Sequence, residues 1–273
     1  MRSIEQWPPE DRRRVTGVFT DIDDTLTTDG AITRDALAAL VALREAGLPV
    51  IAITGRPVGW SEPFAHSWPV TAIVAENGAV ALQLETPTGL PANVEDRAPL
   101  RKTYQQSAPD RFANHARMQA VLERIEREIP GARRATDSAG RETDIAVDHS
   151  EFEHLGDSQI AAVVALMRSE GMNATVSSIH INGWFGNHNK WQGAQWIVRS
   201  LWGRDLKAEI GQWAFIGDST NDVLMFEAFP QSFGVANVRR FEAQLAHKPR
   251  YITNAERGAG FAEFAAALLA TRK

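Results

Sequence analysis

Three carboxylates, Asp21, Asp23 and Asp24, follow directly after a short apolar stretch of the chain. In extended backbone, residues two apart point the same way, so Asp21 and Asp23 can face one small site. Close carboxylates repel one another, and a hard cation that prefers oxygen ligands relieves this repulsion. Acidic residues are also common in turns, so the segment taken alone indicates either a cation site or a capped turn.

A second polar group, Thr54-Gly55-Arg56, follows another apolar stretch. It offers a hydroxyl, a glycine whose amide a ligand can approach closely, and a helix N-terminus that begins near Pro57. These features are typical of an anion-binding corner. A hydroxyl and a glycine at such a place are, however, often only a helix cap.

A third group contains Asp218, Asn221 and Asp222, after the apolar run 213–217. Ligand-binding residues of open α/β sheets lie at the carboxyl ends of the strands, so two acidic strand ends can converge on one metal ion. Lys190 begins a predicted helix, where a cation gains nothing from the helix dipole. It is either a solvent-exposed lysine or the partner of an adjacent anion.

The elements that position these groups have the pattern of a parallel sheet. Val15–Thr20, Leu48–Thr54 and Thr71–Ala75 are short apolar runs bounded by turn signals, which predicts buried strands. Helical spacing and capping residues predict a helix over Thr33–Ala46, which completes a βαβ unit. Asn77-Gly78 then predicts a hairpin that returns residues 79–84 antiparallel.

The parallel pattern resumes after a different unit has intervened. Residues 85–110 are polar and rich in proline, which predicts a linker, and the insert that follows predicts a small α+β unit with helices near 114–128 and 157–170 and strands near 143–148 and 174–181. Beyond Asn187 we expect a helix to about 202, a strand at 213–217, a helix from 219, a strand at 232–236, a helix near 239–246, a short strand at 251 and a last helix. The expected fold class is therefore α/β, with residues 1–86 and 186–273 as the core and 87–185 as a smaller inserted domain.

The composition limits the function classes. The chain has 273 residues, 44% of them hydrophobic, which is enough for a full core and a smaller domain. It has no cysteine, which excludes disulfides and thiolate metal ligands. A net charge of −5 gives no basic field for nucleic acid, and no apolar stretch has the length of a signal peptide or membrane span. We expect a cytoplasmic protein with a small-molecule partner; the oligomeric state stays open.

Taken together and in this order, the motifs resemble those of the haloacid dehalogenase (HAD) superfamily. The matching segments are Asp21–Thr25, Thr54–Arg56, Lys190 and Gly217–Asp222. Glu76–Ala79, Asn189-Lys190 and Gly234–Asn237 resemble further signatures of its Cof-type, class IIB branch, to which sucrose-phosphatase-like and mannosyl-3-phosphoglycerate phosphatase-like proteins belong. The resemblance implies a Rossmann-like core, a parallel sheet flanked by helices, with an α/β cap inserted between the second and third motifs. One departure is Asp24, where many members have glycine.

The resemblance also implies roles for individual residues. Asp21 would be the nucleophile, and Asp23 the general acid and then the general base. Thr54 and Lys190 would hold the phosphoryl group.

Gly55, Arg56 and Asn221 would lie at the substrate, where Asn221 either touches phosphate or orients Lys190. The implied cofactor is Mg²⁺, bound by the side chains of Asp21 and Asp218 and the backbone carbonyl of Asp23. Asp222 would support it.

The expected function is therefore a Mg²⁺-dependent phosphatase, a phosphoric monoester hydrolase, that acts on a small phosphorylated metabolite such as a sugar phosphate through an aspartyl-phosphate intermediate. A sugar phosphomutase of the same superfamily and a non-catalytic phosphosugar-binding protein are the alternatives. Specificity should reside in the insert, because the core motifs contact only phosphate. Ser177, Ser178, His180 and Asn182 offer polar groups there, either for a polyol or simply as the polar face of a half-buried strand.

Overall fold

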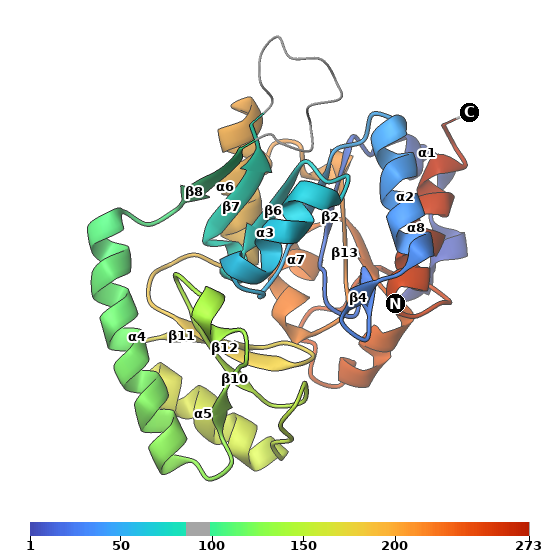
Figure 1. Ribbon diagram of the computed structural model, residues 1–273. Coiled ribbons are helices and arrows are strands. Elements are labelled where there is room, and N and C mark those ends of the chain that lie inside the picture. The colour runs from blue at the N-terminus through green and yellow to red at the C-terminus, as the bar shows by residue number, and fades with distance from the viewer. Residues whose placement is uncertain (86–98, 273) are drawn as a thin grey trace.

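The computed structural model describes residues 1–85 and 99–272 and contains a large α/β core with a smaller cap (Figure 1). The core holds a nine-stranded sheet, and the cap holds a four-stranded sheet of its own. Within the described ranges, no helix combines the length and the hydropathy of a membrane span. Residues 86–98, which include the expected start of the cap, lie outside the description.

In spatial order, the first seven strands of the large sheet pair in parallel, and each of the last two pairs antiparallel with the strand before it. Its inner strands are buried on both faces, which explains their uninterrupted apolar sequences. In spatial order the strands are β1 (Arg2–Ser3), β15 (Tyr251–Ile252), β14 (Gln231–Gly234), β13 (Trp213–Gly217), β2 (Gly17–Thr20), β5 (Val50–Ile53), β6 (Ala72–Ala75), β7 (Val80–Leu84) and β8 (Leu100–Tyr104).

Helices cover both faces of this sheet. On one face lie α2 (Arg34–Glu45), α3 (Val58–Ser67) and α8 (Arg257–Leu269). On the other lie α6 (Lys190–Trp202) and α7 (Val223–Ala228). The expected fold class and the βαβ start of the core are confirmed by this arrangement.

Short elements complete the core. The first is α1 (Pro9–Arg14), and a small hairpin of β3 (Thr27–Thr28) and β4 (Ala31–Ile32) follows the first acidic segment. Within residues 1–85 and 99–272, the 3-10 helices of the core are Ile4–Gln6, Glu76–Gly78, Ile210–Gln212, Thr220–Asp222 and Ala236–Phe241.

The cap is an antiparallel sheet with both of its long helices on one face (Figure 1). The helices are α4 (Ala108–Glu128) and α5 (Asp157–Ser169), and a 3-10 turn lies at Ser138–Gly140. The strands, in spatial order, are β11 (Asn173–Val176), β12 (His180–Trp184), β10 (Ile145–Asp148) and β9 (Arg133–Arg134). Ile181 packs toward the helices, so its neighbours His180 and Asn182 point to the opposite face.

Three sequence-based predictions of elements were wrong. The single strand expected at 174–181 is two strands, because the Ser177 hydroxyl accepts the backbone N–H of His180 and forms a turn. The helix expected at 239–246 is instead the 3-10 segment Ala236–Phe241 and a turn.

The third concerns the linker expected at 85–110, which contains β8. This strand pairs with β7 and so extends the core sheet beyond the expected boundary at residue 86. Its charged residues, Arg101 and Lys102, suit the exposed edge of a sheet and hide the apolar pattern by which strands are recognised.

Candidate active site

Two neighbouring strands of the core sheet bring the acidic motifs together. Asp21 follows β2 and Asp218 follows β13, and Ile216 of β13 is in register with Thr20 of β2. The Asp21 N–H donates to the Ile216 carbonyl at 2.9 Å, which continues the ladder past the end of β2. The two carboxylates therefore emerge side by side at one edge of the sheet, buried at 3% and 1% exposure.

Lys190 lies between these acids. Its Nζ is 2.7 Å from Asp21 Oδ1 and 2.7 Å from Asp222 Oδ1. The side chain is buried, which excludes the alternative of a solvent-exposed lysine. Asn189 caps the helix directly before it, with Oδ1 accepting the Gln192 N–H at 2.9 Å, so the first turn of α6 is fixed with Lys190 at the acids.

The pKa values of the group reflect burial and mutual repulsion. Burial, with repulsion from Asp222 and Asp23, raises the pKa of Asp21 to about 7, although Lys190 opposes the shift. Burial and the charges of Asp21, Asp222 and Asp24 raise the pKa of Asp218 well above its usual range. Burial alone would lower the pKa of Lys190, but its acidic partners raise it. The site thus holds more negative charge than one lysine neutralises.

The donor set fits a divalent cation. One carboxylate oxygen each of Asp21, Asp218 and Asp222 lies within 4.8 Å of the others. Among the described residues, Asp218 Oδ1 is buried without a hydrogen-bond partner. Asp222 is already used, because Oδ1 binds Lys190 and Oδ2 accepts the N–H groups of Asp218 and Ser219 at 3.0 and 3.3 Å. Oxygen ligands of this kind suit Mg²⁺.

The Thr54-Gly55-Arg56 loop follows β5, the next strand of the sheet. Thr54 is fully buried, and its Oγ1 accepts the Arg56 N–H at 3.0 Å. A Cβ on Gly55 would lie 3.2 Å from Asn182 Oδ1 and 3.3 Å from Asn77 Oδ1, so only glycine fits without a shift. The loop is packed between core and cap.

Arg56 joins the core to the cap. Its Nε donates to both oxygens of Asp23 at 3.0 Å, while Nη2 donates to Glu151 Oε1 at 2.8 Å and Nη1 to Asp137 Oδ2 at 3.3 Å. Burial raises the pKa of Asp23, and Arg56 only partly offsets this. The Asp23 side chain faces Arg56 and is not part of the carboxylate group around Asp21.

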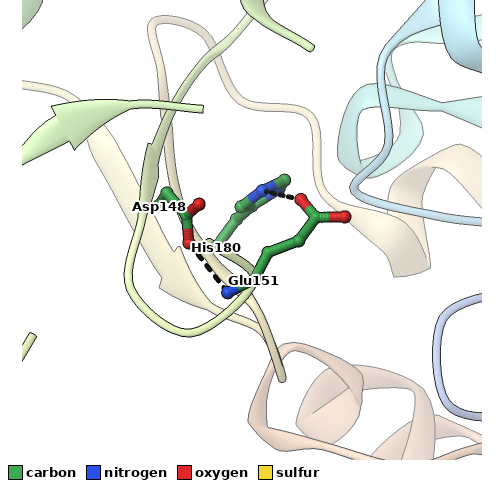
Figure 2. Close-up of side chains that lie close together, drawn as sticks. All are labelled: Asp148, Glu151 and His180. Atoms are coloured by element: carbon green, nitrogen blue, oxygen red, sulfur yellow. Dashed lines mark hydrogen bonds and ion pairs between the residues drawn. The ribbon is translucent and has the colours of Figure 1, made fainter. Parts of the chain in front are cut away.

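The cap side of this contact is a cluster of Asp148, Glu151 and His180. Figure 2 shows the Glu151 carboxylate at the His180 ring and the Asp148 carboxylate at the Glu151 backbone. His180 Nε2 lies 2.8 Å from Glu151 Oε2, and Asp148 accepts the backbone N–H groups of residues 150–153. Donors within the cluster, together with Arg56, therefore satisfy its carboxylates, and no metal cation is needed there.

His180 and Arg56 together lower the pKa of Glu151. Hydrogen bonds and attraction from His180 and Arg56 outweigh burial and lower the pKa of Glu151 to about 2. The contact between cap and core is thus an ion pair at neutral pH.

Two hollows meet at Asp23 and Arg56. The first, of about 10 Å³, lies over Asp21, and its lining also includes Asp23, Arg56, Ser177, Ser178, His180, Asn182 and Asn221. The second is a cleft of about 560 Å³ that opens outward, and its lining includes Asp23, Asp24, Arg56, Glu151, Phe152, Ser178, Arg240 and Arg257. The cleft thus adjoins the hollow over Asp21, with Asp23 and Arg56 in the lining of both.

Glu76 forms a second set of contacts between the core and the cap. It is fully buried and has a left-handed backbone with φ of 50°. Its carboxylate accepts N–H groups from Val58 at 3.1 Å and from Glu142 and Thr143 of the cap at 2.9 and 2.5 Å. The resemblance had drawn attention to this residue but gave it no role.

The structure brings together Asp21, Lys190, Asp218 and Asp222, and it places the remaining predicted residues around them. Asn221 lies at 9% exposure in the lining of the small hollow, and its Oδ1 accepts the Ser219 hydroxyl at 2.9 Å. The hydrogen bonds of Lys190 Nζ go to Asp21 and Asp222. The polar residues 177, 178, 180 and 182 line that hollow too. Glu151 and Asp137 were missed, because nothing in their own segments of sequence indicates a contact with Arg56.

A family model and several solved structures match this chain. Residues 18–108 match the family model of haloacid dehalogenase-like hydrolases. Among curated proteins, no sequence matches the chain.

Solved structures resemble nearly the whole chain. A protein from Thermoplasma acidophilum is 14% identical with a TM-score of 0.66, and the match covers 93% of this chain and 98% of that one. The sucrose-phosphatase from Synechocystis sp. PCC6803, solved in complex with sucrose and phosphate, is 16% identical with a TM-score of 0.61, over 92% and 97% of the chains. A HAD/COF-like hydrolase from Plasmodium vivax is 14% identical with a TM-score of 0.67, over 97% and 100%. At these identities the likeness establishes the fold.

Proposed function

We propose that this chain, as a haloacid dehalogenase-like hydrolase of the Cof type, is a phosphatase that hydrolyses a small sugar phosphate through an aspartyl-phosphate intermediate on Asp21. The observation that carries the proposal is the position of Lys190, whose Nζ is 2.7 Å from both Asp21 and Asp222 beneath the cap. A buried cation beside a nucleophilic carboxylate and an anion-binding loop suits phosphoryl transfer.

In the first step, an Asp21 carboxylate oxygen attacks phosphorus. A bond forms between this oxygen and phosphorus while the bond from phosphorus to the leaving oxygen breaks. Protonated Asp23 gives its proton to that oxygen, so an alcohol departs into the cleft. Lys190 and the Thr54 hydroxyl hold the transferring group against Asp21.

In the second step, water attacks the phosphorus of the aspartyl phosphate. Asp23, now a carboxylate, accepts a proton from this water, and the bond from phosphorus to Asp21 breaks to release inorganic phosphate. Both steps use the same two side chains, and the site returns to its starting protonation state.

The cofactor in this proposal is Mg²⁺. The side chains of Asp21 and Asp218 and the carbonyl of Asp23 would hold it, with Asp222 in support. When bound, it supplies charge neutralisation at the phosphate oxygens.

The substrate class rests on the cleft and on the printed names of structural neighbours. The cleft of about 560 Å³ presents hydroxyl and charged groups beside the exposed ring of Phe152, a mixture suited to a sugar. One neighbour is a sucrose-phosphatase with bound sucrose and phosphate, and another is a trehalose-6-phosphate phosphatase domain from C. albicans. We therefore favour mono- or disaccharide phosphates.

The test is release of inorganic phosphate from a panel of sugar phosphates, nucleotides and phosphorylated cofactors, with MgCl₂ or EDTA. Asp21→Asn is the inactive variant, and Asp35→Asn, which alters an exposed residue of α2, is the matched control. We expect Mg²⁺-dependent release that is lost in Asp21→Asn and retained in Asp35→Asn, with sugar phosphates preferred.

The alternatives give different results. Transfer of phosphate between positions of a sugar without release would identify a mutase. Binding of sugar phosphate without either reaction would identify a non-catalytic protein. Release that survives in Asp21→Asn would refute the assigned nucleophile.

A further inference from the structure

Asn237 is a buried amide that contacts three separate parts of the core. It follows β14, at the end of the signature Gly234–Asn237, and is 3% exposed. Its Nδ2 donates to the Asp24 carbonyl at 3.0 Å and to Asp218 Oδ2 at 3.3 Å. Its Oδ1 accepts the backbone N–H of Arg257 at 2.9 Å. No step of the proposed reaction uses this residue.

The partners fix the orientation of the amide. Two of them, the Asp24 carbonyl and Asp218 Oδ2, are oxygens that only an N–H can satisfy in the carboxylate form. The third, the Arg257 N–H, can only be met by an oxygen. Turning the amide over would place oxygen against oxygen and N–H against N–H, so Nδ2 must face Asp218.

This contact determines which oxygen of Asp218 is free. Asn237 holds Oδ2, whereas Oδ1 is buried without a partner among the described residues. A buried carboxylate oxygen with no partner is costly, and a cation would satisfy it. Asn237 thereby presents one oxygen of Asp218 to the cation and keeps the carboxylate from rotating.

The second contact acts on the segment that follows the nucleophile. Asp24 has a left-handed backbone, with φ of 51°, which a residue other than glycine adopts at some cost. The Asn237 bond to its carbonyl secures that conformation one residue after Asp23. Arg257, also left-handed with φ of 54°, pairs with the Asp24 carboxylate at 3.0 Å. The Asn237 side chain therefore links the segment after Asp23 to Asp218 by hydrogen bonds.

We propose that Asn237 is a positioning residue of the cation site, which orients Asp218 and fixes residue 24 so that the oxygen ligands are preorganised. The inference rests on the Mg²⁺ site of the proposed function. Partners that orient metal ligands typically contribute roughly tenfold to a hundredfold in affinity.

The experiment measures binding of the metal alone, without substrate. MgCl₂ is titrated calorimetrically into the intact protein and into Asn237→Ala, and thermal unfolding is followed with and without MgCl₂. We expect the Kd for Mg²⁺ to rise about tenfold in Asn237→Ala, with a correspondingly smaller rise of Tm on adding Mg²⁺. If Asn237→Ala does not fold, Asn237→Ser is measured in the same way, because its shorter side chain leaves a polar group in place but cannot reach both acceptors.

Gln231→Ala is the matched control. Gln231 is also a buried amide, at the opposite end of β14, and its Oε1 accepts the Trp7 Nε1–H at 2.9 Å. Its loss should lower Tm without changing the Kd for Mg²⁺. An unchanged Kd in a folded Asn237 variant, or an equal change in Gln231→Ala, would overturn the inference alone. Failure of the intact protein to bind Mg²⁺ would instead remove the metal from the proposed function, and the inference with it.

Discussion

Arg56 of the core and Glu151 of the cap form an ion pair across the cleft, with Nη2 2.8 Å from Oε1. The same guanidinium donates to both oxygens of Asp23. Closure of the cap and placement of the proposed acid therefore share one side chain. Glu151→Gln should lower kcat/KM about tenfold, mainly through KM, because a closed cap is less stable without the charge.

The control for this prediction is Glu153→Gln, an exposed residue of the same cap loop. Steady-state phosphate release measures both variants. Equal kinetics in the two variants would show that the ion pair does not contribute to closure.

Lys190→Met should lower kcat roughly 10²- to 10³-fold, because the buried cation beside Asp21 offsets charge on the transferring phosphoryl group. Phosphate release under saturating substrate measures the loss. Lys207→Met, on the exposed surface, should keep full activity. A Lys190→Met enzyme within a few-fold of the intact one would contradict the assignment.

Glu76→Gln should lower the free energy of unfolding by about 2 kcal/mol. All groups that bind the Glu76 carboxylate are donors, so the glutamine amide would place an N–H against an N–H. Urea denaturation measures the change. Exposed Glu45→Gln, in the last turn of α2, should stay within about 0.5 kcal/mol of the parent protein, and a similar result for Glu76→Gln would remove its tethering role.

His188 should make stability depend on pH. Burial lowers its pKa from 6.5 to about 4, so between these pH values His188 is protonated in the unfolded chain and neutral in the folded protein. Stability should therefore fall as pH decreases from 6.5 toward 4, by about 3 kcal/mol for this residue. His188→Phe keeps a ring beside Trp184, whose ring centroid is 5.4 Å away, and should show a weaker loss of Tm over this range. Exposed His66→Phe is the control, and parallel Tm curves for the parent and His188→Phe would refute the effect.

Phe152→Ser should raise KM several-fold for sugar phosphates and leave KM for phosphate esters of short alcohols unchanged. The Phe152 ring is 69% exposed in the cleft lining, where it can pack on the apolar face of a sugar. Phe112→Ser removes a still more exposed ring, at 83%, on α4. If Phe152→Ser and the parent protein have the same KM for every substrate, the sugar does not pack on the Phe152 ring.

The acidic part of the site could be predicted because local sequence specifies it. The apolar runs before Asp21 and Asp218 mark buried parallel strands, and the carboxyl ends of such strands meet at one edge. Lys190 could be placed at its helix start but not assigned a partner, since its contact with Asp21 spans 169 residues. The burial of Lys190 against two acidic residues depends on the tertiary structure.

The contacts between cap and core could not be predicted from local patterns. Glu151 lies in a loop whose sequence resembles any solvated loop, and only the placement of the cap brings it to Arg56. The break at Ser177 was hidden for a related reason, because the apolar and polar residues on either side continue a strand-like pattern. Side-chain bonds to the backbone made that turn.

The hollow over Asp21 has consequences for the time course of turnover. Its volume of about 10 Å³ is close to the minimum for one water molecule and too small for a phosphate ester. In this arrangement the hollow has room for the attacking water, whereas the phosphoryl group of a substrate needs a larger space between cap and core. We therefore expect the cap to be displaced during each catalytic cycle, so the maximal rate should fall as solvent viscosity rises.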